Sequence, residues 1–191
     1  MGSSEHWDLQ SYWHMNALIV VDMQNDFIQG SLEVSGADAI IPAVQRLINY
    51  AIEYKAPVIY TRDWHPAKTS HFDHWPMHCV RNSWGAEFDE RVILPRGLGK
   101  NVYWVSKGTR EDTDGYSGFE NPYLEMILEE NNCTGVIICG LATDYCVKDT
   151  AIDACKAGYT VWVPADAVRG VNLRTTEQAV LEMTLKGIQF E

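Results

Sequence analysis

The feature that most constrains this fold is a regular alternation of short apolar runs with segments of helical character. Five short runs are predicted to be strands, at residues 17–21, 57–61, 102–105, 135–139 and 160–163. Helices are predicted at residues 37–54, 122–130, 144–157 and 175–186. Continuous apolar runs are typical of strands buried on both faces, and strand–helix alternation favours a parallel sheet. The sequence therefore predicts an α/β protein with helices on both faces of one sheet.

The composition is that of one acidic domain. The 191 residues are enough for a substantial core, and 46% of them are hydrophobic. The formal net charge is −11 without a Lys/Arg-rich stripe, which argues against nucleic acid or an anionic membrane as a partner. No apolar run approaches the roughly 20 residues of a membrane span, and no secretory pattern opens the chain. We expect residues 1–16 to be an N-terminal extension and residues 17–191 to form the domain.

The cysteines indicate a reducing environment. Five of them occur, at positions 79, 133, 139, 146 and 155, with no C-x-x-C pair. The odd number and the spacing do not form a disulfide framework or a zinc-finger motif. We therefore expect a cytoplasmic protein, in which one thiol can be reactive. Cys139 is predicted to be core, and Cys79 to be packed, with a metal role as its alternative.

Chemistry-bearing residues follow several of the predicted strands. Open parallel sheets bind ligands at the carboxyl ends of their strands. The predicted strands end at Asp22, Asp63, Lys107, Asp166 and at Gly140, which leads into a cysteine at position 146. Two acids, a lysine and a thiol are thus expected at one edge. The alternative is that polar residues follow strands only because loops are solvated.

Cys146 is the candidate nucleophile. It is predicted to lie in the first turn of a helix capped by Thr143 or Asp144. The helix dipole there favours a thiolate, and the free N–H groups of that turn can hold an oxyanion. Asp22 is suited to take the thiol proton and to return it to a leaving amine. Lys107 is suited to stabilise both the thiolate and the carboxylate.

A histidine-rich loop, residues 64–99, follows the second predicted strand. Asp63 and His65 share one face of the chain, because alternate residues of a strand point to the same side. His71 and His78 can complete a site with them, and His74 is a spare. Three imidazoles and one carboxylate suit one divalent metal ion, Zn²⁺, Fe²⁺ or Mn²⁺. The alternative is a solvated loop with ordinary histidines.

Aromatic residues crowd the same motifs. They are Phe27, Trp64, Trp75, Tyr116 and Phe119. A flat aromatic substrate would pack well among such rings. A plain core role is equally open for Phe119, whereas Phe27 and Trp75 flank polar motif residues and are predicted to be pocket walls.

The ordered motifs resemble a known family from about Ala17 to the C-terminus. They are Asp22-Met23-Gln24-Asn25-Asp26-Phe27, Asp63-x-His65, His78-Cys79-Val80, Lys107-Gly108, Tyr116-Ser117-Gly118-Phe119 and Gly140-Leu141-Ala142-Thr143-Asp144-Tyr145-Cys146-Val147. This set is similar to the nicotinamidase (pyrazinamidase-type) branch of the isochorismatase-like cysteine hydrolases.

The resemblance implies a Rossmann-like three-layer α/β/α fold with a catalytic triad. The implied triad is Asp22, Lys107 and Cys146. The resemblance also implies a cis peptide between Leu141 and Ala142, which aims the amides of Ala142 and Cys146 at the oxyanion.

The resemblance further implies a metal-assisted reaction. It places a divalent metal on Asp63, His65 and His78, with His71 as a fourth ligand whose equivalent varies in the family. The metal would hold the pyridine nitrogen of nicotinamide. The implied activity is hydrolysis of nicotinamide to nicotinate and ammonia through a thioester, in NAD salvage. The implied substrate-binding residues are Phe27, Trp75, Leu141, Ala142 and Tyr116.

Three other functions stay open at this point. A related hydrolase of carbamoyl, ureido or enol-ether substrates would lack the metal. A redox-sensing module would oxidise Cys146 instead of acylating it. A catalytically silent interaction domain is the third. Two departures from the family pattern are Tyr145, where histidine also occurs, and the acidic segment 109–115, which could alter substrate access. The sequence leaves a homo-oligomer open.

Overall fold

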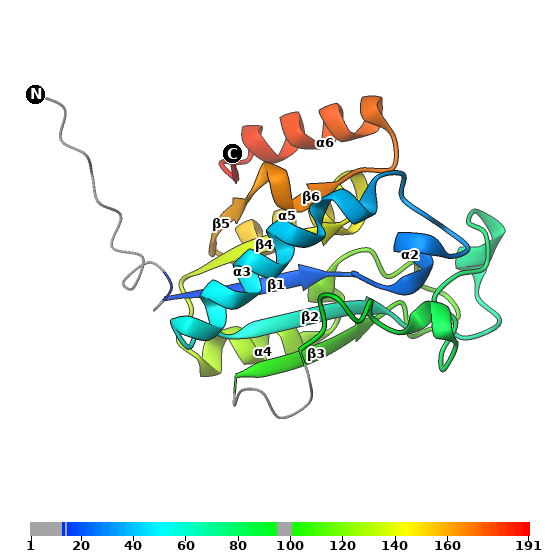
Figure 1. Ribbon diagram of the computed structural model, residues 1–191, viewed down its shortest axis with the longest axis horizontal. Helices are drawn as coiled ribbons and strands as arrows, with labels where there is room; N and C mark the ends of the chain where they lie inside the picture. The colour runs from blue at the N-terminus through cyan, green and yellow to red at the C-terminus, as the bar shows by residue number, and fades with distance from the viewer. Residues whose placement is uncertain (1–12, 14, 95–100) are drawn as a thin grey trace, which may run out of the picture.

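The computed structural model describes residues 13, 15–94 and 101–191, and its centre is an all-parallel sheet. The strand order is β3-β2-β1-β4-β5-β7, with β6 pairing with β4 beyond the end of β5 (Figure 1). The five predicted strands are all present. The strands are β1 (Asn16–Val21), β2 (Val58–Asp63), β3 (Val102–Lys107), β4 (Gly135–Leu141), β5 (Thr160–Val163), β6 (Val168–Arg169) and β7 (Gln189–Phe190).

Helices cover both faces of the sheet, so the predicted three-layer fold is confirmed (Figure 1). Alternate side chains of β1 point to opposite faces. Leu18 and Val20 pack in a cluster with α3 (Ile41–Glu53). Ile19 and Val21 pack in a second cluster on the opposite face. That second cluster contains residues of α4 (Pro122–Glu130), α5 (Lys148–Lys156) and α6 (Leu173–Leu185).

The helix boundaries follow local capping chemistry. Asn121 accepts a hydrogen bond from Tyr123 N, and Pro122 then occupies the first turn of α4, where a missing N–H costs nothing. Asn172 caps α6 in the same way, so that helix begins two residues before the predicted position 175. The segment predicted as one helix at 37–54 begins with a 3₁₀ turn, Ala37–Ile40, before α3.

The segment predicted as one helix at 144–157 differs most from expectation. It begins with a π-helical turn, Thr143–Val147, and α5 starts only at Lys148. The predicted side-chain cap is wrong. The Asp144 carboxylate instead accepts hydrogen bonds from Val171 N and from the Thr175 hydroxyl, so it secures the chain leading into α6. The Thr143 hydroxyl has no hydrogen-bond partner among the described residues.

The long loop after β2 contains little regular structure, as predicted. Two 3₁₀ turns occur in it, Ser70–Asp73 and Trp84–Ala86, and a bridge pairs His65 with Val80. A short helix that the sequence did not predict, α2 (Asn25–Gln29), faces this loop. Residues 95–99 of the predicted loop, and nearly all of the predicted extension 1–16, lie outside the described residues. No helix among the described residues could span a membrane.

Candidate functional site

Four polar side chains meet at the carboxyl edge of the sheet, as the strand ends predict. The Lys107 Nζ lies 2.7 Å from Asp22 Oδ2 and 2.6 Å from Asp63 Oδ1. It also donates hydrogen bonds to Cys146 Sγ at 3.2 Å and to the Gly115 carbonyl at 2.7 Å. The structure thus brings together the predicted Asp22, Lys107 and Cys146. It adds Asp63 as a second carboxylate partner of Lys107, which the sequence assigned to the metal alone.

Asp22 is a carboxylate held in a nearly dry environment. Its side chain is buried, and Thr61 Oγ1 donates a hydrogen bond to Oδ1 at 2.8 Å. Burial raises the pKa of Asp22 to about 6, with the Lys107 ammonium opposing the rise and the Asp63 charge adding to it. Asp22 is therefore a base that titrates close to neutral pH.

The environment of Cys146 disfavours the thiolate. Burial raises its pKa well above the usual range, and the Lys107 ammonium opposes that rise. The sequence predicts the start of a helix at this position, which would favour the thiolate. Desolvation is the larger effect here, and the regular helix begins only after Cys146. A nearby base is consequently needed to generate the nucleophile.

Three buried histidines form a second cluster next to this one. His65, His71 and His78 each offer a ring nitrogen, and the three atoms lie within 4.8 Å of one another. Asp63 Oδ2 faces them, 3.7 Å from His65 Nε2 and 3.9 Å from His78 Nε2. Asp63 therefore connects the two clusters, with one oxygen on Lys107 and the other toward the histidines.

The histidine cluster fits a divalent metal ion. Neither ring nitrogen of His65 has a hydrogen-bond partner among the described residues, although both are buried. Buried polar atoms without partners are costly, and a bound cation would remove that cost for one of the two nitrogens. Burial also lowers the pKa of His71 and of His78, which favours the neutral imidazole that binds metals. His74, the predicted spare, is exposed.

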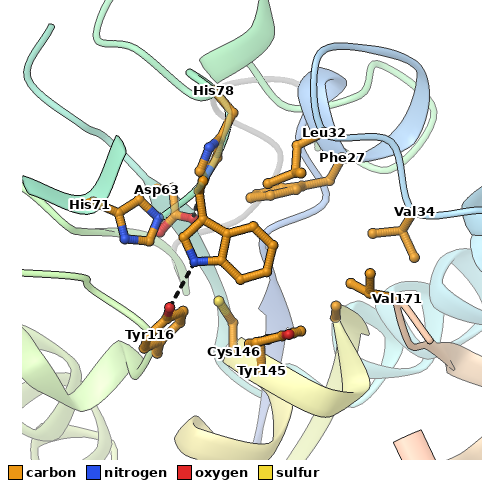
Figure 2. Close-up of a pocket in the computed structure, with 12 residues that line it drawn as sticks. Phe27, Leu32, Val34, Asp63, His71, His78, Tyr116, Tyr145, Cys146 and Val171 are labelled. Atoms are coloured by element: carbon orange, nitrogen blue, oxygen red, sulfur yellow. Dashed lines mark hydrogen bonds and ion pairs between the residues drawn. The ribbon is translucent and has the colours of Figure 1, made fainter. Parts of the chain in front are cut away.

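A pocket opens onto both clusters (Figure 2). His71, His78 and Asp63 lie on one side of it and Phe27, Leu32 and Val34 on the other, with Cys146 between them. The predicted wall residues Phe27, Trp75 and Tyr116 all line it, and so does Ala142. Four further lining residues were not predicted: Leu32, Val34 and Val171, which carry no motif signal, and Tyr145, which lies in the motif directly before Cys146.

Aromatic rings order one wall of the pocket. Trp75 Nε1 donates a hydrogen bond to the Tyr116 hydroxyl at 2.9 Å. The Tyr145 ring contacts Trp75 edge-on, with centroids 5.0 Å apart. A flat ring would therefore meet aromatic surface on one side and the histidine cluster on another.

Several residues named from the sequence lie away from the pocket. Leu141, expected beside the substrate, is buried in the core cluster that contains α3, and it does not line the pocket. The Phe119 ring packs against Tyr159, with the ring centroids 6.3 Å apart. Phe119 therefore has the packing role that was the alternative to a pocket wall. Asp166 is exposed and pairs with Arg46. The implied cis peptide between Leu141 and Ala142 is present.

Comparison with known proteins agrees with this geometry. The isochorismatase domain matches residues 16–190. A nicotinamidase of Escherichia coli (strain K12) is 34% identical over 90% of this chain and 92% of its own length. The crystal structure of a Pyrococcus horikoshii pyrazinamidase in complex with zinc is 44% identical, with a TM-score of 0.86, over 93% of this chain and 98% of that one. A yeast nicotinamidase bound to the inhibitor nicotinaldehyde is 29% identical, with a TM-score of 0.84, over 92% and 99% of the two chains. The chain belongs to the isochorismatase family.

Proposed function

We propose that the protein is a nicotinamidase, an amidohydrolase that converts nicotinamide to nicotinate and ammonia. The observation that carries this proposal is the pocket that joins a buried Asp22–Lys107–Cys146 group to a three-histidine cluster. Nicotinamidases and pyrazinamidases among the relatives, one of them in complex with zinc and one with nicotinaldehyde, support it.

A divalent metal ion is the cofactor of this proposal. Asp63, His65 and His78 would hold it, with His71 as the fourth ligand, and Zn²⁺, Fe²⁺ and Mn²⁺ all suit these donors. When bound, the ion supplies a Lewis acid that can hold the ring nitrogen of the substrate. Phe27, Trp75 and Tyr116 would pack against the ring and exclude water.

The first half of the reaction acylates the cysteine. Asp22 accepts the Cys146 thiol proton while the sulfur attacks the carboxamide carbon, so that a C–S bond forms and the carbonyl oxygen becomes an oxyanion. The backbone amides of Ala142 and Cys146 are the proposed donors to that oxyanion. The tetrahedral intermediate then collapses. Asp22 returns the proton to the leaving nitrogen, the C–N bond breaks, and ammonia departs from a nicotinoyl thioester.

The second half of the reaction releases the acid. Asp22 takes a proton from water, and the hydroxide attacks the thioester carbon. The C–S bond breaks, and the proton returns to Cys146. Lys107 keeps the group together throughout, because its ammonium contacts both carboxylates and the sulfur and offsets whichever of them is charged.

The test is ammonia release from nicotinamide by the purified protein, measured with and without a chelator and with metal analysis of the same sample. We expect turnover that falls on chelation and returns when Zn²⁺, Fe²⁺ or Mn²⁺ is added. A metal-free protein that hydrolyses a carbamoyl or ureido compound and leaves nicotinamide intact would contradict the proposal.

We also propose a place for this reaction in the cytoplasm, in NAD salvage. All five cysteines are free thiols, two of them only partly buried, which suits a reducing compartment. Nicotinate formed by the enzyme would be consumed by a reaction that attaches the pyridine ring to a sugar phosphate.

A further inference from the structure

Three consecutive residues after β3 each contact a different part of the site. The Asp114 carboxylate lies 2.8 Å from His71 Nδ1. The next residue, Gly115, accepts a hydrogen bond from Lys107 through its carbonyl, and the hydroxyl of Tyr116 accepts one from Trp75. The acidic segment 109–115, which the family pattern does not explain, is thereby part of the support of the site.

The three histidines differ in what orients their rings. His78 Nδ1 lies 2.7 Å from the Pro76 carbonyl, a backbone group in its own loop. The two nitrogens of His65 have no hydrogen-bond partner among the described residues. His71 depends on a side chain 43 residues away, Asp114, which is itself about half exposed.

We propose that Asp114 is a positioning residue that fixes His71 as a metal ligand. An N–H on Nδ1 that donates to the Asp114 carboxylate leaves the Nε2 lone pair free for a cation. The carboxylate also makes the imidazole a stronger donor to a metal, which is the usual role of a second partner on a metal-bound histidine. The inference extends the proposed metal site to a residue outside the cluster itself.

The path of the backbone holds Asp114 in place. The chain turns back on itself where Gly115 meets Gly108. A Cβ on Gly115 would lie 2.3 Å from the Gly108 Cα, and a Cβ on Gly108 would lie 2.5 Å from His65 Cε1. At the other end of the segment, Ser70 N donates to the Glu111 carbonyl at 2.9 Å, directly beside His71. Asp114 is thus fixed relative to His71 from both directions.

The experiment measures Zn²⁺ affinity by competition with a chromogenic chelator, on the full chain and without substrate. We expect Asp114→Ala to weaken Zn²⁺ binding by about 10- to 100-fold. Asp114→Asn should weaken Zn²⁺ binding less than Asp114→Ala, because the amide oxygen still accepts the hydrogen bond. Some affinity should still be lost, because the amide carries no charge. The matched control is Asp112→Ala, which removes the same charge from the same loop, at a residue whose ion pair within the described part of the chain is with the exposed Arg110. Its affinity should equal that of the parent protein.

A second comparison separates positioning from general damage. If Asp114 acts through His71, then Asp114→Ala should cause no further loss of Zn²⁺ affinity in a His71→Ala background. The inference is overturned by an equal loss in both backgrounds, by an unchanged affinity in Asp114→Ala, or by a parent protein that binds none of the three metals. Nicotinamide turnover is read separately. Metal binding that depends on Asp114 without turnover would refute the proposed function and leave this inference intact.

Discussion

Lys107 is one buried cation that faces two carboxylates and a thiol. With Asp22 and Asp63 both ionised, the group carries a net negative charge in a dry environment, which is costly. The two acids respond in opposite directions. The pKa of Asp63 is lowered, as the Lys107 ammonium and His65 outweigh its burial, whereas burial raises that of Asp22. Asp22 is therefore the carboxylate better suited to exchange a proton, whereas its lowered pKa favours a charged Asp63 beside the histidines.

Replacement of Cys146 tests the covalent scheme. Cys146→Ala should reduce nicotinamide turnover by at least about 1,000-fold, because the proposed acyl bond forms on the sulfur that this change removes. The fold should persist, since the change removes one atom from a small side chain. Steady-state ammonia release and mass spectrometry of the quenched protein measure this. Full activity in Cys146→Ala, or the absence of a trapped thioester in the parent protein, would sink the mechanism.

The pH profile should report the titration of Asp22. The reaction requires the ionised carboxylate, and its pKa is raised to about 6. The value of kcat/KM should therefore be level above this pH and fall about tenfold for each pH unit below it. Circular dichroism at each pH checks that the loss is not unfolding. An acid limb centred near pH 4, the ordinary range of an aspartate, would contradict a raised pKa for the catalytic carboxylate.

The β1–β4 pair is the structural element that delivers Cys146. Both strands run in register from Asn16↔Gly135 to Val21↔Gly140, and the chain then turns into the pocket. At the last pair Gly140 has φ +112°, and a Cβ there would lie 2.1 Å from the Val21 carbonyl oxygen. Only glycine permits this close approach of the two backbones. Gly140 therefore determines the turn by which the chain leaves β4 and leads to Cys146.

A pair of glycine substitutions tests that point. Gly158 also has a positive φ, +93°, but has nothing within 4 Å of its Cβ position. Gly158→Ala should cost about 1 to 3 kcal/mol of unfolding free energy from backbone strain alone. Gly140→Ala should cost at least about 1 kcal/mol more, because the methyl also collides with Val21. Urea denaturation measures both. Equal losses would show that close packing at Gly140 is unimportant.

The molecule as a whole should be stabilised by the metal. A ligand that binds only the folded state adds about 2.7 kcal/mol at 100 times its Kd, which is about 5 to 10 °C in Tm for a chain of this size. We expect this rise when Zn²⁺ replaces a chelator in thermal unfolding. His65→Ala should remove the rise, whereas His74→Ala, at an exposed histidine of the same loop, should preserve it. A Zn²⁺-dependent rise retained in His65→Ala would contradict the assignment of His65.

The sequence by itself determined the scaffold and which polar groups lie together at the candidate site. Apolar runs gave the five main strands because buried strands need continuous apolar residues. The strand ends gave Asp22, Asp63 and Lys107, because parallel strands end at one edge. The spatial order β3-β2-β1-β4 explains why these side chains meet. Lys107, Asp63 and Asp22 come from the ends of β3, β2 and β1, which are neighbours in the sheet.

Only the tertiary structure decided which partner each charged side chain of the site contacts. Contacts between distant segments have no local signature, so neither the hydrogen bond from Lys107 to one oxygen of Asp63 nor the contact of Asp114 with His71 could be predicted from the sequence. The role of Asp144 changed for the same reason, because Val171 and Thr175 compete for the carboxylate that was expected to cap a helix. Local preferences set the elements, and the burial of charged groups against one another set the site.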